Sequence, residues 1–63
     1  MSGETDAINT VLVGLVERGC SPAEAIDWYF VEVVGHSQTE WAAIRGVSQS
    51  AVSENVAKAR RKV

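Results

Sequence analysis

The chain has 63 residues, a formal net charge of −2 and 46% apolar residues. Its length allows one domain at most, near the lower size limit for folding without a disulfide or metal. One cysteine (Cys20) and one histidine (His36) exclude an intramolecular disulfide and leave no cluster for a metal, so we expect no cofactor. There is neither an apolar run of about 18 residues nor a basic-then-apolar N-terminus, so we expect no membrane span and no secretory signal, and a cytoplasmic location that suits the unpaired thiol.

A first helix is predicted over about residues 6–18, after a frayed segment at residues 1–4. Thr5 can cap this helix, and Asp6 is well placed against the helix dipole. Gly19 is expected to end it. Its apolar face follows the i, i+3, i+4, i+7 spacing: Ile8, Val11, Leu12 and Leu15.

A second helix is predicted to begin after Ser21, which can cap it. Pro22 suits the first helical position, and Glu24 can complete a capping box. The helix should extend to about Val34 and stop at Gly35. A strand is the competing interpretation, because β-branched and aromatic residues are frequent in this stretch. The capping box favours a helix, and its two apolar faces predict burial on both sides.

A second capping box, formed by Ser37 and Glu40, predicts a third helix over about residues 38–45. Trp41 and Ile44 are expected to point into the core. Ala42, which has a small side chain, is expected to allow a close crossing with the next helix.

A turn and a fourth helix are predicted to follow. Gly46 can supply the left-handed backbone of the turn, and Val47 is expected to fill its corner. Ser48 can cap a helix over about residues 49–61. Four residues recur on its inward face: Val52, Val56, Ala59 and Val63.

The charge is unevenly distributed along the chain. Residues 1–36 carry six carboxylates against one arginine, a net charge of −5, whereas residues 37–63 carry five cations against two carboxylates, a net charge of +3. Four of those five cations lie within residues 58–62. A local concentration of positive charge of this kind is typical of a surface that meets a polyanion.

Two helices with a glycine turn and a basic ending predict binding to double-stranded DNA, with the helix at about residues 49–61 in the major groove. Four polar residues are expected to contact base edges: Gln49, Ser50, Ser53 and Glu54. Six others are expected to contact the phosphate backbone: Thr39, Ser48, Lys58, Arg60, Arg61 and Lys62. Each feature alone also occurs in all-α proteins that bind no nucleic acid, but their order and spacing favour DNA.

A homodimer is expected, because one domain of this size makes few phosphate contacts. Pairing through the first two helices would place two half-sites about one helical turn apart. Four residues are expected at that interface: Val13, Val16, Trp28 and Val31. The alternative is a protein-interaction module that binds a polymerase subunit or another regulator. No enzyme or small-molecule ligand is expected, since no catalytic constellation or phosphate loop is present.

Residues from about 21 to 63 resemble region four of bacterial RNA polymerase sigma factors, especially the short extracytoplasmic-function type. Four segments carry the resemblance. They are the mainly apolar residues 27–34 with the Gly35-His36-Ser37 segment that follows, Trp41-Ala42-Ala43-Ile44, Gly46-Val47-Ser48, and the inward-facing residues of the fourth predicted helix together with the basic residues 58–62. Gln38-Thr39-Glu40-Trp41 followed by Arg45-Gly46-Val47-Ser48-Gln49 is also similar to small haloarchaeal helix-turn-helix proteins.

This resemblance implies an all-α, stand-alone regulator of transcription. Arg45 departs from the family pattern, which usually has an apolar residue before the turn glycine. No segment resembles the sigma region that binds the upstream promoter element and core polymerase together. A sigma function therefore does not follow from the resemblance.

Overall fold

A computed structural model describes the backbone of residues 2–63 and the side chains of residues 8–63. The elements are α1 (Ser2–Glu17), α2 (Pro22–Trp28), the π-helical segment η1 (Tyr29–Val33), α3 (Gln38–Arg45) and α4 (Gln49–Lys62). No strand occurs among them, so the fold is all-α as predicted. None of these helices combines the length and apolar character that a bilayer crossing requires.

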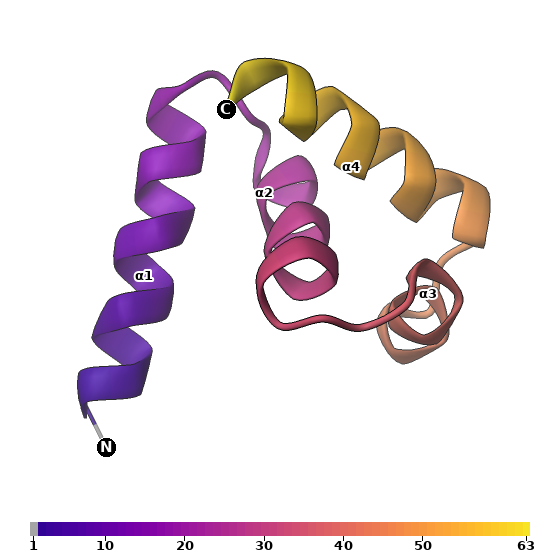
Figure 1. Cartoon of the computed structure of the whole chain (residues 1–63), viewed down its shortest axis with the longest axis horizontal. Coiled ribbons are helices and arrows are strands. Elements are labelled where there is room, and N and C mark those ends of the chain that lie inside the picture. The colour runs from indigo at the N-terminus through magenta and orange to yellow at the C-terminus, as the bar shows by residue number, and fades with distance from the viewer. Residues whose placement is uncertain (1) are drawn as a thin grey trace.

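The second helix occupies the middle of the molecule (Figure 1). It packs against α1 on one side and against α4 on the other, and α3 packs against α4 and η1. The last turn of α4 returns to the loop between α1 and α2, where the chain ends (Figure 1). This arrangement leaves α1 packed mainly on one neighbour, whereas α4 is held from two sides.

The start of α1 differs from the prediction. The helix begins at Ser2, so Thr5 lies within the helix and not at its N-cap position. Residues 2–4, which were expected to be frayed, are helical, and Met1 lies outside the described residues. Nothing in this segment prevents a helix, and acidic residues are favourable in a first turn. The other end agrees with the prediction, since Gly19 takes a left-handed φ of 98° just after the helix.

The second helix begins as predicted and continues in a different form. The backbone N–H of Glu24 donates to Ser21 Oγ at 3.2 Å, and the backbone N–H of Ser21 donates to Glu24 Oε1 at 3.0 Å. From Tyr29 the helix is π-helical, and the N–H of Val34 donates to the Tyr29 carbonyl at 3.0 Å. A turn closed by i→i+5 bonds holds one more residue than an α turn. The strand alternative is therefore wrong.

Two buried clusters form the core. The first joins the end of α1 to α2 and α4: Leu15, Cys20, Ala25 and Ala59. The second joins α3 to α4: Trp41, Ala42, Val52 and Val56. Trp28 packs against both clusters and so connects them. Phe30 and Val31, neighbours in η1, both pack against the second. The thiol of Cys20 is buried in the first of these clusters.

Two residues predicted to lie in the core or at the corner of the turn are exposed. Ile44 is 64% exposed, because the buried side of α3 is formed by Trp41, Ala42 and Arg45. At about 100° per residue, Ile44 projects well away from the centre of that face. Val47 is 37% exposed, and its backbone N–H, not its side chain, secures the corner by donating to the Ala42 carbonyl at 3.0 Å.

The inward face of α4 agrees with the prediction over most of its length. Val52, Val56 and Ala59 have no exposed surface. Val63, however, is 44% exposed, because the helix ends at Lys62 and the helical spacing no longer applies to the residue that follows. The apolar contacts of the helix therefore come from its first three turns.

Candidate nucleic-acid interface

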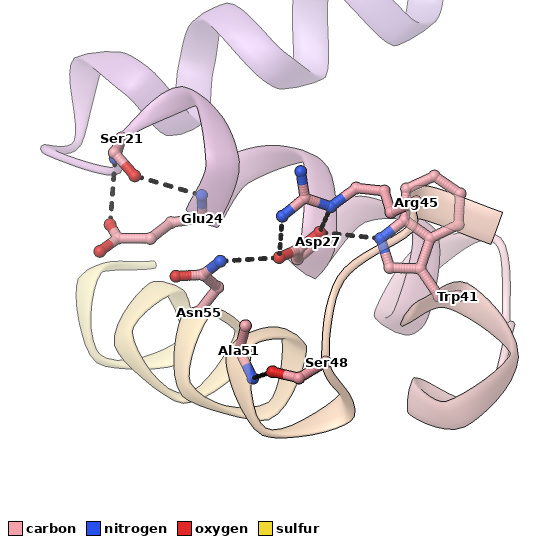
Figure 2. Close-up of polar contacts among 8 residues, drawn as sticks. All are labelled: Ser21, Glu24, Asp27, Trp41, Arg45, Ser48, Ala51 and Asn55. Carbon is pink, nitrogen blue, oxygen red and sulfur yellow. Dashed lines mark hydrogen bonds and ion pairs between the residues drawn. The ribbon is translucent and has the colours of Figure 1, made fainter. Parts of the chain in front are cut away.

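The α3–turn–α4 unit occupies the predicted residues. The backbone N–H of Glu40 donates to Ser37 Oγ at 3.0 Å, and the Ser37 N–H donates to Glu40 Oε1 at 3.2 Å. Gly46 has a φ of 74° and ends α3 in the left-handed conformation. Ser48 Oγ then accepts from the backbone N–H of Ala51 at 3.1 Å and caps α4 (Figure 2). Both helices therefore begin at defined positions, which fixes the register of their outward side chains.

A fully buried carboxylate, that of Asp27 in α2, holds this unit in place (Figure 2). Trp41 Nε1–H donates to its Oδ1 at 2.8 Å, and Asn55 Nδ2 donates to its Oδ2 at 2.8 Å. Arg45 Nη2 donates to Oδ2 at 3.1 Å. A buried charge is tolerated when it is paired and hydrogen-bonded in this way. Because the partners come from α3 and α4, Asp27 fixes both helices relative to α2.

Arg45 makes a second contact with this carboxylate. Its Nε lies 2.7 Å from Asp27 Oδ1. That nitrogen is buried and has no hydrogen-bond partner among the described residues, so the contact is an ion pair without a directed hydrogen bond. The contact explains why a cation stands before the turn glycine. Sequence reasoning missed the pair, although an aspartate within an apolar run and an unexpected arginine were both visible.

Aromatic rings enclose the other side of Trp41. The ring of Phe30 stacks on it with centroids 4.2 Å apart and 12° between the planes. The ring of His36 stacks at 5.8 Å and 18°. Trp41 is therefore a core residue, as expected, and is not presented for stacking on a base. His36 lies in the loop before α3.

The four residues predicted to contact bases lie on the first half of α4. Gln49, Ser50 and Glu54 are exposed, and Ser53 is partly buried. Gln49 Nε2 donates to Oε1 of Gln38, the first residue of α3, at 3.2 Å. This bond joins the first residues of the two helices and was not foreseen from the sequence. The outward start of α4 is thus polar, and at least one of its side chains is held in position.

The predicted backbone contacts divide into two groups. Thr39 and Ser48 are exposed near the starts of α3 and α4. The basic residues lie on the second half of α4, where Arg61 forms no ion pair or side-chain hydrogen bond within residues 8–63. Lys58 Nζ lies 3.6 Å from Glu54 Oε1, one turn earlier on the same helix. These positions are compatible with the phosphates that flank a groove.

The other two cations make contacts with α2, η1 and the loop after α1. Arg60 Nη2 lies 2.6 Å from Glu32 Oε2, and this hydrogen bond raises the pKa of Arg60 above its usual value. Lys62 Nζ donates to Glu24 Oε1 at 2.8 Å and to the Gly19 carbonyl at 3.0 Å. The bond from Lys62, with a smaller contribution from the Ser21 N–H, lowers the pKa of Glu24. The basic ending is therefore also a brace, which sequence reasoning missed.

The residues predicted at a dimer interface lie in two environments. Val13 and Val16 are 56% and 47% exposed on α1. They line an apolar groove of about 240 Å³ between α1 and α2, together with Leu12, Glu17, Pro22, Ala25 and Ile26. Trp28 and Val31 are only partly exposed, because each packs against the core of its own chain. The structure thus brings the two valines together and places the other two residues elsewhere.

No group of three histidine, cysteine or acidic side chains that could hold a metal occurs in the described part of the chain. No protein-family model, curated protein or solved structure matches this sequence or fold. The resemblance to sigma region four therefore rests on the residues quoted for it and stays a prediction.

Proposed function

We propose that the chain binds double-stranded DNA and regulates transcription, with α4 in the major groove and α3 across the backbone. One observation carries the proposal. The outward-facing residues at the start of α4 are polar and mostly exposed, and hydrogen bonds to Asp27 fix α4 at a defined angle to α3. A recognition helix needs both properties, because base contacts form only when register and orientation are set in advance.

Gln49 is the best candidate for a base contact of defined specificity. A glutamine amide has two N–H donors and a carbonyl acceptor. One donor is engaged by Gln38, which leaves one donor and the carbonyl. That remaining pair matches the N7 acceptor and N6 donor of adenine in the major groove. The hydroxyls of Ser50 and Ser53 suit either a base or a phosphate, and Glu54 suits the amino group of cytosine.

The phosphate contacts are assigned to five of the six predicted residues: Thr39, Ser48, Lys58, Arg60 and Arg61. The sixth, Lys62, donates to Glu24 and to the Gly19 carbonyl in the free protein. Backbone N–H groups at the start of α4 add a further anion-binding element. Residues 1–36 carry a net charge of −5, from six carboxylates and one arginine. This part of the chain repels phosphate and therefore favours an orientation in which residues 37–63 face the DNA.

We further propose that two copies pair through α1 and α2, so that two recognition helices address successive turns of the groove. The exposed Val13 and Val16, with the groove beside them, supply the apolar part of this contact. Trp28 and Val31 pack against the core of their own chain and do not line the groove, so the two valines carry the proposed contact. Equilibrium sedimentation that shows a monomer at concentrations of tens of micromolar would refute the pairing.

DNA binding is tested by fluorescence anisotropy with a labelled mixed-sequence duplex at several salt concentrations. Wild-type affinity is expected to fall steeply with salt, and Arg61→Gln should reduce the slope of log K against log salt by about 1. Arg18→Gln is the matched control, because Arg18 is an exposed arginine beside α1. It should leave the slope unchanged.

The second candidate is a protein-interaction module. The apolar groove between α1 and α2 favours it, since exposed apolar surface on a small domain commonly meets another protein. A folded wild-type protein that binds no duplex at low salt would favour this function over DNA binding.

A further inference from the structure

The ion pair between Arg60 and Glu32 is more exposed to solvent than the ion pair between Lys62 and Glu24. Glu32 belongs to η1, and the two side chains are 55% and 33% exposed, so water reaches both charges. Their oxygen–nitrogen separation of 2.6 Å places the two groups in a charge-assisted hydrogen bond in the free protein. The pair can nevertheless open without leaving a buried charge.

Lys62 is held in another way. Its partner Glu24 is only 10% exposed in its side chain and also accepts the capping bond from the Ser21 N–H. Lys62 donates a second bond to the Gly19 carbonyl. Removing Lys62 would leave a nearly buried carboxylate without its cation, which is costly. Lys62 is therefore a brace, whereas Arg60 is exchangeable.

Building on the proposed DNA binding, we propose that Glu32 is an internal competitor for DNA phosphate that occupies Arg60 in the free protein. Arg60 Nη2 donates to Glu32 Oε2, and a phosphate that takes this donor must displace the carboxylate. The two anions would also repel each other at the same guanidinium, so they compete for it. Duplex affinity is lowered by the free energy of that displaced pair.

This competition acts on every duplex alike. Phosphate contacts fix register and carry no sequence information. Glu32 therefore reduces affinity for random and preferred sequences by the same factor. Exposed ion pairs are weak, so the factor is small: about two- to fivefold.

The test is a double-mutant cycle read by anisotropy on a labelled mixed-sequence duplex at low salt. Glu32→Gln keeps the side-chain size and should bind about two- to fivefold more tightly than wild type. In an Arg60→Gln background the same change should have no effect, because no cation is left to release. The Arg60→Gln background is also the control for charge, since Glu32→Gln removes the same carboxylate there without releasing an ion-paired cation.

The outcomes separate the two proposals. A gain that requires Arg60 supports the competition. No gain, or an equal gain in the Arg60→Gln background, overturns it and leaves the DNA-binding proposal standing. If circular dichroism shows every variant folded and none binds the duplex, both proposals fall.

Discussion

The indole N–H of Trp41 donates a 2.8 Å hydrogen bond to the carboxylate of Asp27, which has no exposed surface. The donor lies in α3 and the acceptor in α2. Arg45 and Asn55 complete the surroundings of the same carboxylate from α3 and α4. The angle between the two helices of the candidate interface is thus set by one buried charge as well as by apolar packing.

Replacing that charge should destabilise the whole domain. Asp27→Ala leaves the Trp41 and Asn55 donors and the Arg45 guanidinium without their acceptor, and breaking a buried pair costs about 3–5 kcal/mol. Such a loss is comparable with the total stability of many small domains. Thermal and urea unfolding followed by circular dichroism should show a large decrease or an unfolded protein.

Two controls belong with this prediction. Asp27→Asn keeps the shape but turns an NH₂ group toward donors, so its stability should lie between those of Asp27→Ala and wild type. Ile44→Ala alters a residue that is 64% exposed and should change stability little. An Asp27→Ala protein as stable as wild type would contradict the role assigned to the carboxylate.

Local features of the fold could be predicted from the sequence. The two capping boxes, the left-handed Gly46 and the buried Val52 and Val56 all depend on residues within a few positions of each other. Short-range hydrogen bonding and helical spacing determine such features. For the same reason, most of the outward polar residues of α4 were placed correctly on its surface.

The contacts between helices could not be predicted in this way. Asp27 meets partners 14, 18 and 28 positions away, and Arg60 meets Glu32 across 28 positions. These pairs depend on the crossing angles of helices, which apolar spacing does not specify. Apolar character alone also favoured Ile44 over Arg45 for the inner face of α3. The π-helical form of η1 has no local sequence mark among its apolar residues.

Stability should depend on pH through Glu24. The bond from Lys62, aided by the Ser21 N–H, lowers the pKa of this carboxyl below its usual value of 4.5. A group with a lowered folded-state pKa contributes its stability above pH 4.5 and loses it as pH falls through the lowered value. Wild type should therefore lose more stability than Glu24→Gln between neutral pH and strong acid.

Melting temperatures across that pH range provide the measurement. Glu17→Gln is the control, because Glu17 is exposed and forms no ion pair in the described part of the chain. Its acid dependence should parallel that of wild type. Parallel curves for wild type and Glu24→Gln would show that the Lys62 contact adds nothing to stability.

The Gln38–Gln49 bond should affect sequence discrimination on DNA. Gln49→Ala removes the proposed adenine contact and should cost about 1–3 kcal/mol at one base pair of a duplex selected from a random pool. Gln38→Ala leaves Gln49 in place but releases its amide, so discrimination at the same base pair should weaken less. Affinities for the selected duplex and its single-base variants measure both effects. If the wild-type protein binds the selected duplex and its single-base variants with equal affinity, Gln49 does not recognise a base.

Pairing through α1 should depend on its exposed valines. Val13→Lys with Val16→Lys places two charges beside the apolar groove, and desolvating them in a dimer contact would be unfavourable. The variant should sediment as a monomer where wild type is dimeric, and should lose affinity for a duplex with two half-sites far more than for one with a single half-site. Val33→Lys is the matched control, since Val33 is 52% exposed on η1, away from that groove. If both variants dimerise like wild type, the contact between copies lies elsewhere than at α1.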